Sequence, residues 1–179
     1  MENYCYQDQL ESERLITRKL VPTDNVIWSA FFDDKDATEF LFLESLGLNS
    51  NLEIANHIIE KQITRYTENR FGLQVLINKS TNEFIGLCGL LAQDVDGVNE
   101  IEVGYHIFKK YWKQGFATEA AKLFIDYAFK NNLTNSIISV IDVDNFKSRR
   151  VAEKNGLKID KKTKWLDDED VYIYRITNN

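Results

Sequence analysis

The sequence has little of several residue types on which small folds often depend. Its 179 residues include two cysteines, two histidines and a single proline, Pro22. Cys5 and Cys88 lie far apart and form no C-x-x-C or Cys/His ligand spacing, so we expect both to be reduced, with neither a disulfide nor a zinc site. His57 and His106 are equally isolated and suggest no metal. The single proline excludes a proline-rich linker.

Long apolar runs are also missing. No stretch reaches the 18 or so apolar residues that a membrane-spanning helix needs. The segment from Met1 to Leu10 lacks the basic and apolar regions of a signal peptide. We therefore expect a soluble, cytoplasmic protein without a membrane partner.

Positive charge is in the minority. The chain has 28 acidic and 22 basic residues, a net charge of -6 and a pI near 5.0. Such a surface repels a phosphate backbone, so nucleic acid is not an expected partner. The same surface attracts a cationic amine, and a local basic cluster is still able to bind a small anion.

What is present is the composition of an ordinary globular domain. The chain is 44% hydrophobic, 28% charged and 12% aromatic, which is too apolar for a disordered chain. A chain of this length buries roughly 70% of the surface that its unfolded form exposes. Because no period of 20 to 50 residues repeats, we expect residues 1–179 to form one domain.

Hydrophobic periodicity predicts helices and strands in a mixed order. After a first strand at 14–20, two helices are expected at 25–42, interrupted at Asp33 and Asp34, and at 49–70. Three short apolar runs predict an antiparallel meander at 73–77, 84–91 and 101–107, with turns at 78–82 and 94–97. The remaining elements are a helix at 115–130, a strand at 137–143, a helix from Asn145 to Gly156, and strands at 157–165 and 171–176. The expected fold class is α+β, or mixed α/β, with helices flanking the sheet.

The most informative segment places a short loop between a strand and a helix. The loop reads Trp112-Lys113-Gln114-Gly115-Phe116-Ala117. Its small residues allow close approach to the backbone, and the N–H groups at the start of the helix can hold a phosphate. Lys109, Lys110 and Lys113 add positive charge. Every helix offers such N–H groups, and the loop is neither a P-loop nor a G-x-G-x-x-G loop, so by itself it defines no site.

This loop resembles the acetyl-CoA pyrophosphate loop of the GNAT N-acetyltransferase superfamily, whose pattern is Gln/Arg-x-x-Gly-x-Gly/Ala. Trp112 departs from the first position of that pattern. The resemblance is to the RimJ/RimL branch of ribosomal-protein acetyltransferases, and it extends from about Leu10 to Ile176. The other segments that carry it are residues 10–18, Gly104-Tyr105, Ala117-Thr118-Glu119-Ala120 and Asn145-x-x-Ser148-x-x-x-x-Glu153-Lys154-x-Gly156-Leu157. It implies a twisted, largely antiparallel sheet with a splayed central strand pair.

The resemblance also implies how acetyl-CoA is bound. The loop backbone would hold the pyrophosphate, and the end of the preceding strand would run beside pantetheine where the sheet splays. Asn145 and Ser148 would approach from the next strand and helix, although Asn145 equally fits a plain helix N-cap and Ser148 an exposed helix residue. The expected cofactor-binding residues are Tyr105, His106, Ile107, Gln114, Gly115, Phe116, Ala117, Thr118, Asn145 and Ser148, with no metal.

Acetyl transfer needs a neutral amine, a donor for the developing oxyanion and a proton for the departing thiolate. The resemblance makes Glu102 the base, acting through water, against the alternative of a solvated strand residue. Strand alternation puts His106 on the same face, as a second candidate base. A backbone N–H near Ile107 is the expected oxyanion donor. Where many members carry a proton-donating tyrosine this chain has Ala152, so we expect Ser148, or a water it orders, to take that role.

These features predict transfer of an acetyl group from acetyl-CoA to a primary amine by direct attack. The sequence leaves open whether the acceptor is a protein N-terminus, a polyamine, an aminoglycoside or another small amine. It also leaves open whether the protein is a homodimer. A non-catalytic module of the same fold that binds CoA or a protein is the alternative.

The resemblance places the acceptor pocket between the first helical pair, about residues 28–70, and the final hairpin, about 165–172. Aromatic side chains in the first region line that pocket or belong to the core. They are Trp28, Phe31, Phe32, Phe40 and Phe42. The acidic run at 167–170 either attracts a cationic acceptor or is a solvated turn.

Overall fold

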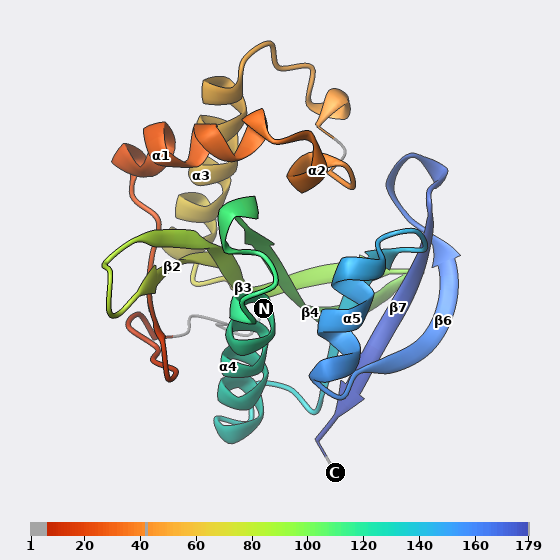
Figure 1. Ribbon diagram of the computed structural model, residues 1–179. Helices are drawn as coiled ribbons and strands as arrows, with labels where there is room; N and C mark the ends of the chain where they lie inside the picture. Colours follow the sequence, from red (N-terminus) through yellow and green to blue (C-terminus); the bar gives the residue numbers. More distant parts are fainter. Residues whose placement is uncertain (1–6, 42, 179) are drawn as a thin grey trace.

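The structure, a computed structural model, describes residues 7–41 and 43–178. Phe42 and Cys5 lie outside the described residues. Seven strands form one sheet in the order β1-β2-β3-β4-β5-β7-β6 (Figure 1). The pairing of β4 with β5 is parallel, and the other registered pairs are antiparallel. The mixed α/β fold class expected from the sequence is therefore confirmed.

The first half of the chain supplies four strands and three of the helices. These elements are β1 (Leu15–Arg18), α1 (Asn25–Ser29), α2 (Lys35–Thr38), α3 (Asn51–Thr67), β2 (Leu73–Asn78), β3 (Phe84–Val95) and β4 (Val98–Ile107). The second half supplies α4 (Phe116–Lys130), β5 (Ser136–Asp142), α5 (Phe146–Lys154), β6 (Lys158–Lys164) and β7 (Asp170–Thr177). Short 3₁₀ turns connect several of them, namely η1 (Pro22–Asp24), η2 (Ala30–Asp33), η3 (Glu44–Leu46), η4 (Lys109–Tyr111) and η5 (Leu166–Asp168).

The segment expected as one interrupted helix at 25–42 is a series of short helical pieces. Asp34 adopts an extended conformation, and its carboxylate accepts hydrogen bonds from the N–H groups of Asp36 and Ala37. An aspartate in this position ends one helical segment and caps the next. The expected interruption is thus confirmed, whereas the expected extension of the helix to residue 42 was wrong, because α2 ends at Thr38.

The hairpin of β3 and β4 is longer than its apolar runs indicated. Its turn consists of Asp96 and Gly97, both with positive φ (54° and 79°), and the ladder continues to the pair Val95↔Val98. Two residues of this kind favour a tight hairpin turn. The expected turn at 94–97 was therefore too long.

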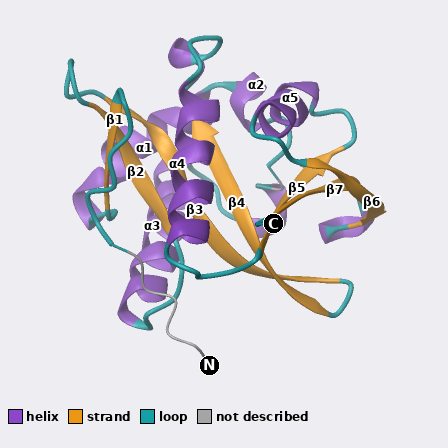
Figure 2. Ribbon diagram, turned by 90° about the horizontal axis from the view of Figure 1, so that it is seen from below, coloured by secondary structure: helices purple, strands orange, loops and turns teal. Residues whose placement is uncertain are grey.

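The two faces of the sheet have separate hydrophobic cores. α4 and α5 cover one face, with Ile107, Phe124 and Ile137 in its core. α1 and α3 cover the other face over β2 and β3, where Trp28 and Ile59 are buried. Figure 2 shows α4 crossing one side of the strands with α1 and α3 behind them. Across residues 7–41 and 43–178, no helix has the length and apolar character to cross a membrane.

Candidate active site

β4 and β5 meet at one registered pair, Glu102↔Ile138, and then part. Directly after β4, Phe108 donates its N–H to a carbonyl of β3 at 3.1 Å, and the β3–β4 register runs without a bulge. Because N–H groups alternate along an antiparallel strand, those of Tyr105 and Ile107 face away from β3 into the gap. Within the described chain no strand pairs with them there. The splayed strand pair implied by the family resemblance is therefore present.

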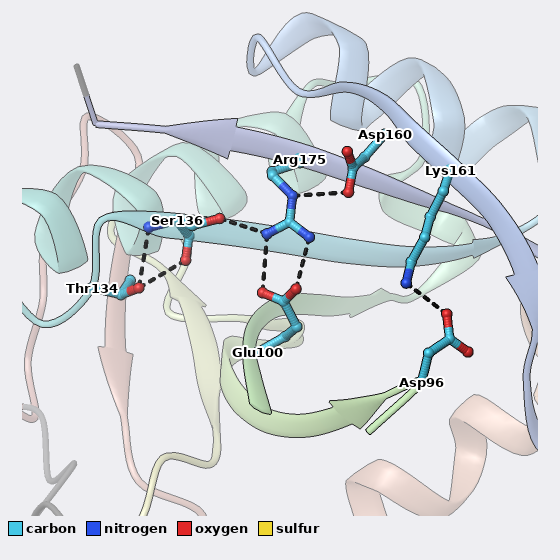
Figure 3. Close-up of polar contacts among 7 residues, drawn as sticks. All are labelled: Asp96, Glu100, Thr134, Ser136, Asp160, Lys161 and Arg175. Carbon is cyan, nitrogen blue, oxygen red and sulfur yellow. Dashed lines mark hydrogen bonds and ion pairs between the residues drawn. The ribbon is translucent and has the colours of Figure 1, made fainter. Parts of the chain in front are cut away.

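Arg175 of β7 closes the other end of this fork (Figure 3). Its guanidinium binds both carboxylate oxygens of Glu100 at 3.0 and 2.7 Å, the carboxylate of Asp160 at 3.0 Å and the hydroxyl of Ser136 at 2.7 Å. The hydrogen bonds that the guanidinium donates to the carboxylates, first to Glu100 and then to Asp160, raise the pKa of Arg175. The network joins β4, β5, β6 and β7 at the end of the fork where the strands meet.

The carboxylate of Glu102 lies at the point where the strands part. It is buried, and its two oxygens accept hydrogen bonds from the N–H of Val140 (3.2 Å) and the amide of Gln93 (2.6 Å). Burial raises the pKa of Glu102 above its usual range. The alternative of a solvated strand residue was wrong, because the carboxylate holds β5 next to β4 just beyond their last ladder pair.

His106 shares a face of β4 with Glu102, four residues and roughly 13 Å further along the strand. The aromatic rings of Trp28 and Phe31 lie 6.4 and 6.2 Å from its imidazole, centroid to centroid. Burial lowers the pKa of His106 to about 4, so the imidazole is neutral at pH 7. The shared face expected from strand alternation is confirmed.

The loop between β4 and α4 contains two left-handed residues, Lys113 (φ 62°) and Gly115 (φ 86°). Only glycine adopts this region at no steric cost, which accounts for Gly115. The first helical hydrogen bond of α4 runs from the N–H of Glu119 to the carbonyl of Gly115. The N–H groups of Phe116, Ala117 and Thr118 therefore have no partner within the helix, and no side chain caps them in the described structure.

Arg14, directly before β1, braces this loop. Its guanidinium donates to the carbonyl of Gln114 (2.9 Å) and to the carboxylate of Glu119 (2.7 Å), and it lies 4.3 Å from the ring centroid of Phe116. Glu119 also accepts the backbone N–H of Arg14 and the hydroxyl of Ser12, each at 2.7 Å. Sequence reasoning missed this brace. Both Arg14 and Glu119 lie in segments that carry the family resemblance, but 105 residues separate them.

Two of the three lysines expected beside the loop pair with acidic side chains. The ammonium of Lys109 lies 2.5 Å from Asp36, and that of Lys110 lies 3.5 Å from Glu83. Lys113 forms no ion pair with any described residue. The expected local excess of positive charge is therefore smaller than the sequence suggested.

α5 forms the opposite wall of the gap. Asn145 caps this helix by accepting the N–H of Ser148 at 3.1 Å, as its alternative role predicted. The phenol of Tyr105 donates to the main-chain carbonyl of Ser148 at 3.0 Å, and burial raises the pKa of that phenol, so it keeps its proton. The ammonium of Lys147 lies 4.4 Å from the ring of Trp112. α5 thus contacts both β4 and the loop across the gap.

A small cavity of about 220 Å³ lies beside His106. Its walls come from α1, η2, η3, α3, β4 and η5, and they include Trp28, Phe32, Leu46, Ile58, His106 and Leu166. The aromatic side chains of this region were expected either to line the pocket or to belong to the core. The core includes Trp28, Phe31 and Phe32, and the cavity is also lined by Trp28 and Phe32. Phe40 is half-buried and lies outside its walls.

Two aspartates of the acidic run in the final hairpin are paired with lysines. Asp170 binds Lys162 at 2.7 Å and Lys164 at 3.0 Å, and Asp168 lies 3.7 Å from Lys164. This pairing favours a solvated turn over a free anionic patch.

The sequence and the fold match those of a known family. A sequence profile of the acetyltransferase (GNAT) domain matches residues 14–158. The uncharacterised N-acetyltransferase YoaA of Bacillus subtilis is 30% identical over 83% of this chain and 82% of that protein. YkkB of the same organism is 35% identical over 52% of this chain and 56% of that protein.

Among solved structures, that of RimL, described as a ribosomal L7/L12 alpha-N-protein acetyltransferase in complex with coenzyme A, has a TM-score of 0.77. The match covers 95% of this chain and 98% of that chain at 14% identity, so it supports the fold alone. The chain belongs to the GNAT family of acetyl-CoA-dependent N-acetyltransferases, as the resemblance of its motifs implied.

Proposed function

We propose that acetyl-CoA binds in the gap between β4 and β5, with its pyrophosphate at the start of α4. The observation that carries this proposal is a set of main-chain N–H groups that no helix or strand of the described chain pairs. Phe116, Ala117 and Thr118 supply three at the helix N-terminus, and Tyr105 and Ile107 supply two along the gap. Helix N-termini bind phosphate through such groups, aided by the helix dipole. The coenzyme A complex of the similarly folded RimL supports the same cofactor.

Three further residues shape the backbone around this site, namely Gln114, Gly115 and Asn145. Gly115 gives the loop its left-handed bend, and the carbonyl of Gln114 is held by Arg14. Asn145 caps α5 and thereby fixes the turn that faces pantetheine. We retain all three as cofactor-site residues on this basis.

The reaction joins the amine nitrogen to the acetyl carbon and breaks the bond between that carbon and sulfur. The amine loses one proton and the departing thiolate gains one. The N–H of Ile107, directed into the gap, would stabilise the oxyanion that forms in between. Holding amine and thioester next to each other supplies much of the remaining rate.

Glu102 is the base of this proposal, acting through a water molecule. Its buried carboxylate has a raised pKa, which brings it closer to the pH at which general bases work best. Ser148 is the proposed proton donor to the thiolate, because Ala152, at the position of the family tyrosine, has no proton to give. Tyr105 binds the carbonyl of Ser148 and so positions the turn that carries this hydroxyl.

The acceptor is a primary amine, and a protein N-terminus is one class supported by the name of RimL. Nucleic acid remains outside the proposed partners because of the acidic charge balance. A homodimer and a cytoplasmic location stay predictions of the sequence.

The proposal is tested by incubating the protein with acetyl-CoA and a panel of primary amines and following release of free thiol. Thiol release that depends on the acceptor supports it. Tight binding of coenzyme A by calorimetry without turnover of any amine would instead favour a non-catalytic module.

A second assay tests the proton donor. Ser148→Ala should lower kcat with little change in the affinity for acetyl-CoA, while Ser136→Ala, at the closed end of the fork, serves as the matched control. If Ser148→Ala kept the wild-type turnover across the whole pH range, a water molecule or another group would have to protonate the thiolate.

A further inference from the structure

The cavity beside His106 is apolar. The described residues that line it include no charged side chain, and Ser45 and His106 are its polar members besides the indole of Trp28. The imidazole of His106 is neutral at physiological pH because burial lowers its pKa to about 4. An ammonium or guanidinium inside this cavity would lose its hydration without gaining a counter-charge.

The cavity also has a size limit. At about 220 Å³ it is smaller than the roughly 300–1,000 Å³ of pockets that bury drug-sized ligands. A single aliphatic or aromatic group fits such a volume, whereas the several rings of an aminoglycoside do not.

Trp28, one of the lining residues, has a polar atom without a partner. The indole N–H of Trp28 is buried and forms no hydrogen bond within the described structure. Buried donors are nearly always paired in folded proteins, so an unpaired one calls for an explanation. A carbonyl oxygen of a bound molecule is the kind of acceptor that would satisfy it.

Part of the acidic run beside the cavity is neutralised. Leu166 belongs to the wall, and two of the acidic residues that follow it, Asp168 and Asp170, are paired with Lys162 and Lys164. Inside the cavity, whose described lining carries no charge, shape and apolar contact determine the selectivity.

We propose that this cavity binds the side chain of the acceptor, and that the acceptor is the α-amine of a residue with an apolar side chain. This inference rests on the proposed function, since it assumes that the amine reaches the thioester from the His106 face of β4. The carbonyl of the same residue accepts the N–H of Trp28. Amine, apolar group and carbonyl are the three features that an N-terminal residue combines.

The test compares kcat/KM for matched amines in the thiol-release assay. Leucinamide should exceed serinamide, lysinamide and spermidine by roughly tenfold or more, since apolar pockets discriminate by about this factor for one or two carbon atoms. Leucinamide should also exceed 3-methylbutylamine, which has the same side chain without the carbonyl, after correction for the fraction of free amine.

A variant pair links the preference to the cavity. Leu166 is 59% exposed, so Leu166→Lys should leave the fold intact while placing a charge at the cavity wall. We expect its KM for leucinamide to rise roughly tenfold, with a clearly smaller rise for serinamide and no change in the Kd for acetyl-CoA. Val98→Lys, at a similarly exposed residue of the β3–β4 hairpin (53%), should match the wild type.

The outcomes separate this inference from the proposed function. If acetyl-CoA is bound and amines are acetylated, but serinamide or spermidine is used as well as leucinamide, the inference is wrong and the proposed function stands. Equal use of leucinamide and 3-methylbutylamine would overturn the role of Trp28. Failure to acetylate any amine would overturn both.

Discussion

The two ends of the fork between β4 and β5 are built from the same strands and differ in how completely their polar groups are paired. At the closed end, Arg175 binds both oxygens of Glu100 and also Asp160 and Ser136. At the open end, the N–H groups of Tyr105 and Ile107 face a gap that no described strand fills.

This difference separates stability from function within one sheet. Satisfied polar networks fix a single arrangement, whereas unpaired backbone groups are costly and are kept where a ligand completes them. Glu102 lies at the boundary, where it takes part in holding the strands and in the proposed chemistry.

The largest effect is expected for Glu102→Gln. The amide retains the shape of the carboxylate and an oxygen for the N–H of Val140, so the fold should persist while the base is lost. We expect kcat/KM to fall by roughly 100-fold or more at pH 7, and by less at high pH, where free amine is abundant. A pH–rate profile measures this, with thermal melting as the control for folding. Equal activity of both proteins at every pH would remove the base role.

Arg175→Met should damage stability and spare the chemistry. It leaves the carboxylate of Glu100, 13% exposed, without its bidentate partner, so the free energy of unfolding should fall by about 2 kcal/mol. Lys161→Met is the matched control, since the pair of Lys161 with Asp96 is exposed (Figure 3) and is worth roughly 0–1 kcal/mol. Urea unfolding compares the two variants. Equal losses would show that the closed end is no more stabilising than the surface pair.

His106 should make the protein less stable in acid. Its folded pKa of about 4 lies below the unfolded value of 6.5, so below pH 6.5 the unfolded state binds a proton that the folded state does not. The stability present above pH 6.5 is therefore lost as the pH falls toward 4, by on the order of 2 kcal/mol. His106→Gln should show a smaller loss over this window in urea titrations. If the free energy of unfolding of the variant fell as steeply with pH as that of the wild type, other groups would cause the acid sensitivity.

The smallest expected effect is that of Arg14→Met, which removes the brace of the loop but no group that touches the reacting atoms. The KM for acetyl-CoA should rise about tenfold, equivalent to about 1.4 kcal/mol, with kcat unchanged. Lys79→Met, which removes an exposed ion pair between the turn after β2 and the segment before β1, is the control. A fall in kcat at unchanged KM would indicate that Arg14 acts on the transition state instead.

Local sequence signals predicted much of the fold. Asn145 and Gly156 marked the ends of α5, and the structure has the expected side-chain cap at Asn145 and a left-handed glycine at 156 (φ 84°). The meander followed from apolar runs and turns. The predicted helix at 25–42 was too long, because the side chain of Asp34 binds backbone N–H groups and so interrupts the helix. Hydrophobic periodicity does not reveal this competition.

The candidate site was also predicted only in part, because sequence motifs report on residues that are close together in the chain. The loop and the fork were implied by motifs that are contiguous in sequence. The contacts that complete the site join distant residues: Arg14 with Glu119, and Glu102 with the N–H of Val140. No spacing rule connects such pairs, since only the packed sheet brings them together.

Backbone hydrogen exchange with and without saturating acetyl-CoA tests the central claim most directly, because it reads the open end of the fork itself. The amides of Tyr105, Ile107 and residues 116–118 should exchange at least several-fold more slowly with the cofactor bound. The amide of Phe108, which already bonds to β3, should change little. If calorimetry shows acetyl-CoA binding while the exchange of these five amides stays the same, the cofactor lies elsewhere and the account is contradicted.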